Sequence, residues 1–256
     1  MQQPERLEKI IEMLNELGQV DVISLANSFD VTEQTVRRDL ATLCQRGLAT
    51  RMHGGARRLA STASLSYEAR RMNNIAAKSA IGKKAAELIP DASSVILNIG
   101  TTTEQVATAL AGHQNLKVIT NNINIISIMQ SANLSSLIQV GGMVRQSDGA
   151  VVGEEAVEFI SRYKADYAVI GASSIDDDGS ILDFDSREVA VARAILKNAR
   201  TRILVADQSK FEINAPVRIA SIDEVDFVVM DAEPSNAFAQ AARDAGTQIL
   251  VAGSNQ

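Results

Sequence analysis

The chain has 256 residues, of which 46% are hydrophobic, so it can bury one substantial core and a smaller satellite domain. No apolar run approaches the roughly 20 residues that span a bilayer, and the first ten residues lack the apolar centre of a secretory signal. We therefore expect a cytoplasmic protein with no membrane partner. One cysteine and two histidines leave little for thiol or zinc chemistry, and we expect no metal and no cofactor.

The net charge of -6 argues against binding to nucleic acid only if the charge is averaged over the whole chain. Residues 1–58 hold eight basic and eight acidic side chains, so the whole negative excess belongs to the rest of the chain. Within this segment, residues 34–58 carry six arginines and a single acidic residue, Asp39. A local basic surface of this kind is what attraction to phosphates requires.

Three helical segments are predicted at the N-terminus. Residues 5–17 place apolar side chains at helical spacing. Asp21 is placed to cap a second helix over 22–29, and Thr32 to cap a third over 33–47. The apolar positions expected to supply the core contacts are Leu7, Ile10, Ile11, Leu14 and Leu17 in the first helix and Ile23, Leu25, Ala26 and Phe29 in the second. This order of helices and turns is the helix-turn-helix pattern.

The third helix has one apolar face and one polar face. At about 100° per residue, Val36, Leu40 and Leu43 share one side, and Gln34 and Arg38 lie opposite. An arginine fork suits guanine and an amide suits adenine, so the polar face can enter a major groove. A solvated surface is the alternative interpretation of a lone Arg-Arg pair, but the two preceding helices favour DNA. The DNA contacts expected from this helix and its cap are Thr32, Gln34, Thr35, Arg37 and Arg38.

The segment after this helix, LATRMHGGARRL, predicts a strand, a turn at Gly54 and Gly55, and a return strand. Such a hairpin is a wing, and Arg51, His53 and Arg57 are further candidate DNA contacts. His53 could equally be an exposed turn residue. LANSFDVTEQTVRRDL followed by RMHGGA resembles the winged helix of DeoR-family bacterial transcription regulators. The resemblance implies a repressor of operator DNA with a sugar-phosphate-sensing domain, acting as a homo-oligomer, a dimer or tetramer.

The rest of the chain alternates apolar runs with helical stretches. LASTASLS is small and polar, so we expect a linker over 59–74 between a DNA-binding domain, 1–58, and an effector domain, 75–256. Alternation of this kind predicts an α/β fold with a largely parallel sheet covered on both faces. The runs predicted as strands are 94–99, 116–121, 137–142, 167–172, 202–207, 226–230 and 248–253.

Ligands of such sheets bind beyond the carboxyl ends of the strands. Gly100 and the threonines after it open a helix whose N-H groups and hydroxyls could hold a phosphate, although threonines cap helices in many proteins. Lys210 supplies a cation. The candidate ligand residues at these ends are Gly100, Thr101, Thr102, Thr103, Asn121, Asn122, Gly141, Gly142, Gly171, Ser173 and Lys210.

The motifs IGTTTEQVA, ITNN, VGGMVR, VIGASSID and VADQSKF extend the resemblance to the DeoR-family sensor domain. Within the family, LDFDSREV is similar to the segment of the glycerol-3-phosphate regulon repressors, which implies glycerol 3-phosphate as effector. By the same resemblance Thr101, Thr102 and Lys210 would hold its phosphate. Asp183, Asp185 and Glu188 would meet hydroxyls or order the loop.

Two other functions have to be weighed. The sensor fold resembles ribose-5-phosphate isomerase, but Ile170 and Ser173 flank the Gly-Ala step where that family has carboxylates, so we expect no catalytic residues and no enzyme. The acidic stretch 173–185 has nearly the spacing of a calcium loop. It follows an apolar strand instead of a helix and ends in Asp185 where a glutamate is usual, so a solvated turn over 176–179 is preferred to a metal site.

Overall fold

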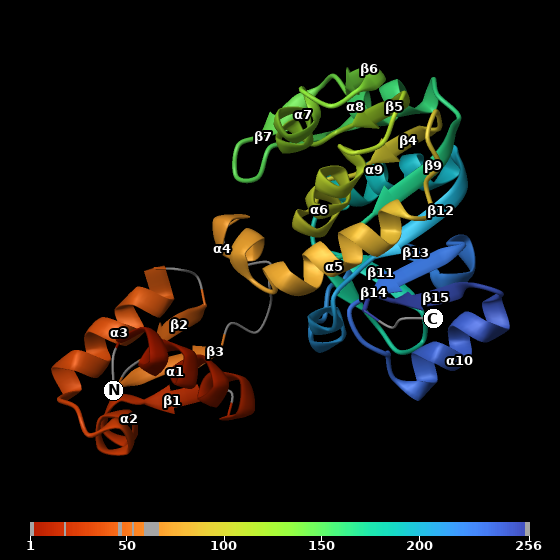
Figure 1. Cartoon of the computed structure of the whole chain (residues 1–256). Helices are drawn as coiled ribbons and strands as arrows, with labels where there is room; N and C mark the ends of the chain where they lie inside the picture. Colours follow the sequence, from red (N-terminus) through yellow and green to blue (C-terminus); the bar gives the residue numbers. More distant parts are fainter. Residues whose placement is uncertain (1–2, 18, 46–47, 53, 59–66, 254–256) are drawn as a thin grey trace. The chain divides into compact units, whose positions relative to one another are not determined.

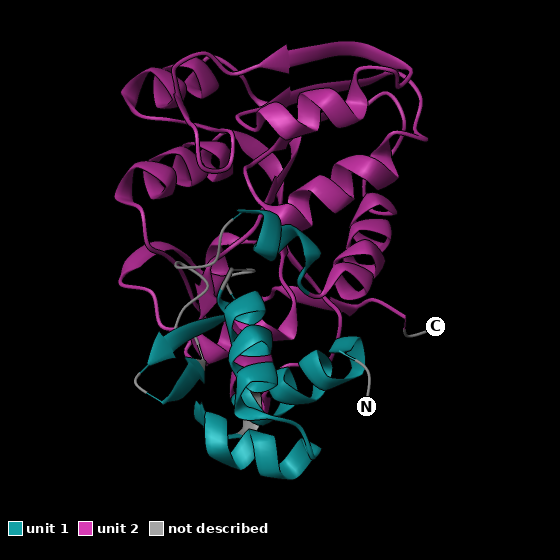
Figure 2. Ribbon diagram, turned by 90° about the vertical axis from the view of Figure 1, so that its left-hand side faces the viewer, with its two compact units in different colours: residues 1–73 teal, residues 74–256 magenta. Residues whose placement is uncertain are grey.

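The computed structural model describes residues 3–17, 19–45, 48–52, 54–58 and 67–253 (Figure 1). They belong to two compact units, residues 1–73 and 74–256 (Figure 2). Each unit has its own apolar core. No helix among the described residues is both long and apolar enough to cross a bilayer. The predicted linker residues 59–66 lie outside the described part of the chain.

The first unit is a small helical fold with a three-stranded antiparallel sheet in the order β1-β3-β2. Both predicted caps are confirmed: an Asp21 carboxylate oxygen accepts from the Ser24 N-H at 2.8 Å, and the Thr32 hydroxyl accepts from the Thr35 N-H at 3.2 Å. The wing hairpin is also confirmed, whereas β1 was not predicted. The elements are α1 (Gln3–Leu17), β1 (Gln19–Asp21), α2 (Val22–Phe29), α3 (Glu33–Gln45), β2 (Ala49–Met52), β3 (Gly55–Arg58) and α4 (Tyr67–Met72).

Two of the predicted core positions in this unit were wrong. Leu17 is 63% exposed and Ile23 is 62% exposed. Leu17 is the last residue of α1, one turn beyond the fully buried Leu14. The short α2 buries a narrow stripe that starts at Val22 and continues through Leu25, and Ile23 lies about 100° away from Val22 on the solvent side.

The second unit is built on a seven-stranded, entirely parallel sheet in the order β15-β14-β12-β9-β4-β5-β6, which confirms the predicted α/β class. One face packs against α5, α6 and α7, and the other against α8, α9 and α10. The strands are β4 (Ser94–Leu97), β5 (Leu116–Thr120), β6 (Leu134–Gln139), β9 (Ala165–Ile170), β12 (Ala199–Val205), β14 (Phe227–Met230) and β15 (Gln248–Val251). The helices are α5 (Ile75–Ala86), α6 (Thr101–Leu110), α7 (Ile123–Met129), α8 (Glu154–Ser161), α9 (Ser186–Lys197) and α10 (Asn236–Ala245).

Two smaller antiparallel sheets complete this unit and were not predicted. One is the hairpin of β7 (Met143–Arg145) and β8 (Ala150–Val152). The other joins β10 (Ser174–Ile175), β11 (Ser180–Asp183) and β13 (Val217–Ser221). The edge strand β6 begins at Leu134, earlier than the apolar run at 137, because Ser135 and Ser136 can lie on an edge without a continuous apolar sequence. Short 3-10 helices cover Gln208–Glu212 (η2) and Ile222–Glu224 (η3).

Candidate functional site

The outward face of α3 is the candidate DNA-reading surface. Gln34, Arg37 and Arg38 are exposed, while Val36, Leu40 and Leu43 are buried in the core of the unit. Arg37 makes an exposed ion pair with Glu33 at 2.8 Å. The Arg38 guanidinium has no partner among the described residues, which leaves its planar fork available to a base edge.

The wing presents two of its predicted contacts to solvent. Arg51 and Arg57 are exposed on β2 and β3. His53 lies outside the described residues. A Cβ at Gly55 would come within 2.1 Å of the Val20 carbonyl oxygen, so only glycine lets β3 pass this close to β1.

A buried ion pair joins the first helix to the reading helix, and no sequence pattern indicated it. The Arg6 Nε lies 2.5 Å from an Asp39 carboxylate oxygen, and the Gln3 side-chain amide donates to the other oxygen at 3.0 Å. Arg6 is 6% exposed and Asp39 is 1% exposed. A charge pair this deep fixes the position of α3 on α1, because neither partner can be left alone at low cost.

The sensor sheet has its topological switch point between β4 and β9. From β4 the chain adds β5 and β6 on one side, then returns to β9, β12, β14 and β15 on the other. Ligands of open α/β sheets bind in the crevice at such a point, outside the carboxyl ends of the strands. The predicted residues Gly100 to Thr103, Asn121, Asn122, Gly171, Ser173 and Lys210 follow strands β4, β5, β9 and β12 and therefore share this edge.

The loop after β4 gives the crevice a helix N-terminus. Gly100 has a φ of 144°, which favours glycine, and α6 begins at Thr101 with N-H groups that can face an anion. Thr101 is half-buried and Thr102 is 6% exposed. The Thr103 hydroxyl is used inside the loop, where it donates to the carbonyls of Asn98 and Gly100 at 2.8 and 2.7 Å.

Two lysines add positive charge at the same edge. Lys210 lies in η2, directly after β12, and is half-buried. Lys78, one turn into α5, is 3% exposed. Burial alone would raise the pKa of Asp207, but the ammonium groups of Lys210 and Lys78 and a hydrogen bond from Ser209 hold it below its usual value. Lys78 was missed because a single lysine within AKSAIG carries no pattern of its own.

Carboxylates gather near the same edge of the sheet. Asp183 ends β11, is 6% exposed and accepts from the Ser173 hydroxyl at 3.0 Å. Asp185 caps α9 by accepting from the Arg187 N-H at 2.9 Å, and Glu188 lies in the first turn of that helix. The three acidic residues predicted from the sequence are thus brought together by the fold around one helix start.

The pKa values of two of these carboxyl groups are shifted in opposite directions. A hydrogen bond from Arg187, with further help from Arg145, lowers the pKa of Asp185 to about 2. Burial, and then the charge of Asp183, raises the pKa of Glu188 to about 7, although Arg145 opposes the shift. Asp185 is therefore ionised at neutral pH, while burial favours the neutral form of Glu188.

A chain of polar contacts joins these acids to the loops after β4 and β5. Glu104, 1% exposed on α6, accepts from the side-chain amides of Asn122 and Asn124 at 3.0 and 3.2 Å. Asn124 also donates to the Asp148 carbonyl at 2.9 Å. Asp148 in turn holds the Arg145 guanidinium through two hydrogen bonds of 2.9 and 2.7 Å. Sequence reasoning missed Glu104, Arg145 and Asp148, although Arg145 closes the VGGMVR motif.

Two buried amide oxygens in this region have no hydrogen-bond partner among the described residues: Asn98 Oδ1 and Asn121 Oδ1. Asn98 is 2% exposed and Asn121 is fully buried. Both residues directly follow strands of the parallel sheet, so both oxygens are available to accept hydrogen bonds at its edge. By contrast, the Asn122 side chain is occupied with Glu104 and with the Asn124 N-H.

Three of the predicted ligand residues, Gly141, Gly142 and Gly171, are glycines and offer a ligand only their backbone. Gly142 has a φ of 138°, and a Cβ there would come within 3.2 Å of Val151. A Cβ at Gly141 would meet open space, and one at Gly171 would lie 3.9 Å from the Val205 carbonyl oxygen. Only the backbone conformation of Gly142 therefore favours glycine, whereas a Cβ at Gly141 or Gly171 would be accommodated.

The predicted acidic turn, residues 176–179, is the turn of a β-hairpin between β10 and β11. Asp177 and Asp178 are exposed, and Asp178 accepts from the Ser180 N-H at 2.8 Å. Gly179 takes a φ of 86°. In the described part of the chain no group of three metal-ligating side chains could hold an ion.

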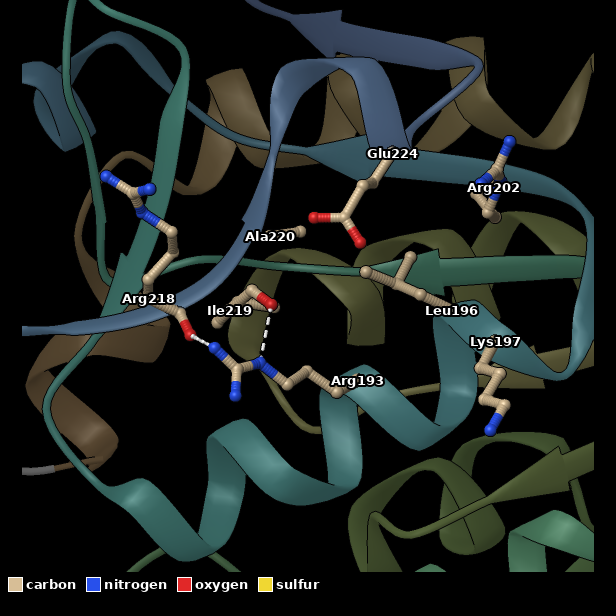
Figure 3. Close-up of a pocket in the computed structure, with 8 residues that line it drawn as sticks. All are labelled: Arg193, Leu196, Lys197, Arg202, Arg218, Ile219, Ala220 and Glu224. Carbon is tan, nitrogen blue, oxygen red and sulfur yellow. Dashed lines mark hydrogen bonds between the residues drawn. The ribbon is translucent and has the colours of Figure 1, made fainter.

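A hollow of about 460 Å³ lies between α9, β12 and β13 (Figure 3). Two of its cations already have protein partners: Arg193 donates to the carbonyls of Ile219 and Arg218 at 3.0 and 2.5 Å, and Arg202 pairs with Asp226 at 3.1 Å. Glu224 extends into the hollow (Figure 3). The charged groups do not converge on one point, so this hollow is a poorer phosphate site than the strand edge.

Comparison with known proteins gives matches over both units. Residues 6–62 match the DeoR-like helix-turn-helix domain, and residues 73–232 match the DeoR C terminal sensor domain. The chain is 40% identical over 249 residues to the glycerol-3-phosphate regulon repressor of Escherichia coli (strain K12), covering 97% of this chain and 99% of the relative. It is 34% identical over 246 residues to the HTH-type transcriptional repressor CsqR of the same organism, covering 96% and 94% of the two chains.

Among solved structures, a ribose 5-phosphate isomerase from Plasmodium falciparum matches with 14% identity and a TM-score of 0.38. The match covers 54% of this chain and 53% of that one. At this TM-score the likeness carries no argument about activity.

Proposed function

Because the chain belongs to the DeoR family of transcription repressors, we propose that residues 1–58 bind operator DNA and that residues 75–256 sense a phosphorylated effector which relieves that binding. Its relatives along nearly the whole length are repressors, which is not an enzymatic role. Since operator DNA is its partner, we place the protein in the cytoplasm. We propose that it acts as a homo-oligomer, because a single winged helix makes limited specific contact with DNA.

In this proposal α3 lies in the major groove. Arg38 and Gln34 read base edges, whereas Arg37, Thr35 and Thr32 lie at the flanks, where phosphates run. The wing adds Arg51, His53 and Arg57 to the contacts with the DNA phosphates. The support is the exposed Arg38, with no partner among the described residues, on a helix whose opposite face is locked in the core.

The effector proposal rests on the two kinds of polar group at this edge of the sheet. The α6 N-terminus at Gly100 to Thr102, with Lys210 and the buried Lys78, is suited to an anion, and Asp183, Asp185 and Glu188 are suited to hydroxyls. A ligand with a phosphate at one end and hydroxyls at the other satisfies both. The side-chain oxygens of Asn98 and Asn121, which have no partner within the described residues, are further acceptors for hydroxyls.

Glycerol 3-phosphate is the effector we propose, supported by the name and the full-length similarity of the regulon repressor. A different sugar phosphate is the alternative, because CsqR is also similar over nearly the whole chain and carries another name. The proposed ligand set also includes Thr103, Asn122, Gly141, Gly142, Gly171 and Ser173, which shape the loops around the crevice.

A thermal-shift screen of the full chain tests this. Glycerol 3-phosphate at 100 times its Kd should stabilise the folded protein by about 2.7 kcal/mol. Lys210→Met should abolish the shift, while Lys164→Met, on an exposed lysine that donates to the Lys197 carbonyl, should keep it. A response to another sugar phosphate alone would reject glycerol 3-phosphate, and no response to any phosphorylated metabolite would reject the sensor proposal.

A further inference from the structure

The guanidinium of Arg145 is shared by three carboxylates from two separate parts of the sensor unit. It donates to Asp148 through Nε and Nη2, to Asp185 through Nη1 at 2.9 Å, and to Glu188 through Nη2 at 2.5 Å. Asp148 belongs to the turn of the hairpin that carries Arg145. Asp185 and Glu188 belong to the start of α9, 40 and 43 residues further along the chain.

The hairpin that carries Arg145 is also held by contacts with elements other than α9. Ala150 and Val152 of β8 form a small buried cluster with Ile99 of the β4 loop. The Ile123 N-H donates to the Gly149 carbonyl at 3.1 Å, so the turn is also tied to the start of α7, beside which the hairpin lies (Figure 1). Arg145 therefore extends from a fixed hairpin toward the first turn of α9.

We infer that Arg145 is a positioning residue of the effector site, which holds the Asp185 and Glu188 carboxylates so that they can accept hydrogen bonds from the hydroxyl end of the effector. The inference rests on the proposed function above. Arg145 itself need not touch the effector, because its four hydrogen bonds within the described part of the chain all go to protein carboxylates.

The charge count separates this role from that of an ordinary ion pair. One guanidinium faces Asp148, Asp185 and Glu188, and the buried Asp183 adds a fourth acid next to Glu188. A pair that served only to join the hairpin to α9 would need one carboxylate. Acceptor oxygens in excess of donors, largely removed from water, are suited to a polyol whose hydroxyls donate.

A second arginine provides the matched control. Arg187 also donates to Asp185, at 3.1 and 2.9 Å, but its side chain is 55% exposed, and among the described residues Asp185 is the one carboxylate with which it pairs. If the need were only for positive charge beside Asp185, either arginine would serve. If Arg145 positions both acids, the two arginines have different effects.

The test measures release of operator DNA from the full chain by glycerol 3-phosphate, for wild type, R145Q, R145K and R187Q. We expect R145Q to bind operator within about twofold of wild type without effector, and to need at least about tenfold more glycerol 3-phosphate for half-release, as for loss of a charge-assisted hydrogen bond. R145K should fall between, because an ammonium cannot span three carboxylates in the plane of a guanidinium. R187Q should stay within about twofold of wild type, since Arg145 still holds both acids.

Three outcomes would overturn the inference, each judged by the glycerol 3-phosphate concentration needed for half-release. R145Q could need the same concentration as wild type, R145Q and R187Q could need the same increase, or R145K could need no more than wild type. If R145Q does not fold, R145K with its graded response carries the test. A wild type that glycerol 3-phosphate does not release at all would instead reject the proposed function, so the two failures are distinguishable.

Discussion

Replacing Asp39 with asparagine tests whether the buried ion pair with Arg6 sets the stability of the DNA-reading unit. The substitution keeps the shape of the side chain and removes its charge, so the Arg6 guanidinium, 6% exposed, loses the counter-ion at Asp39. Breaking a buried pair by removing one partner typically costs about 3–5 kcal/mol. The amide oxygen can still accept one hydrogen bond, so we expect a loss at the lower end, about 3 kcal/mol.

Hydrogen exchange followed by mass spectrometry measures this effect in each unit separately. Peptides from α1 and α3 should lose about 3 kcal/mol of protection against exchange. The protection of peptides from the seven-stranded sheet should stay unchanged and serves as the internal reference. Glu33→Gln is the control, because it removes an exposed pair with Arg37 that contributes less than about 1 kcal/mol. Equal protection in D39N and E33Q would refute the reasoning.

Three further predictions concern the reading helix α3, the carboxylate of Glu188 and the packing of α5 against α6. Arg38→Ala should cost roughly 1–3 kcal/mol of discrimination at one base position in competition binding, and an unchanged sequence preference would remove α3 from the groove. Glu188 favours its neutral form in the folded chain, so its contribution to stability is full below its ordinary pKa of 4.5 and is lost as pH rises through about 7. The unfolding free energy of E188Q relative to wild type should therefore rise by up to about 3 kcal/mol from pH 4.5 to about 8 in urea titrations, and a difference independent of pH would contradict this. Gly82→Ala should destabilise the sensor unit by about 1–3 kcal/mol because a Cβ would come within 2.6 Å of the Gln105 backbone, whereas Gly112→Ala, with 3.8 Å to its nearest neighbour, should differ little from wild type in the same titrations.

The elements that could be predicted well from the sequence are those set by local periodicity. The faces of α3 followed from helical spacing alone, and the parallel sheet followed from apolar runs that alternate with helices. Asp21 and Thr32 could be placed at the starts of α2 and α3 because a capping residue is adjacent in sequence to the helix it caps. Such signals need only a few neighbouring residues.

The parts that could not be predicted depend on residues far apart in the chain. Arg145 acquires its role from Asp185 and Glu188, and Lys78 acquires its role from Asp207, which lies in a distant part of the sequence. The pairing of β1 with β3 is also a tertiary contact, from a strand of only three residues. Ile23 was predicted to be buried because it is apolar. It is exposed, because the buried stripe of α2 is too narrow to include it.

The central claim is that a ligand with a phosphate at one end and hydroxyls at the other releases the protein from DNA. Fluorescence anisotropy of a labelled DNA fragment, selected by the full-length protein from a random pool, measures this directly. Glycerol 3-phosphate should lower the anisotropy to that of free DNA, whereas glycerol and inorganic phosphate, at the same concentration and ionic strength, should not. Release by glycerol or phosphate alone, or none by glycerol 3-phosphate, would contradict the account.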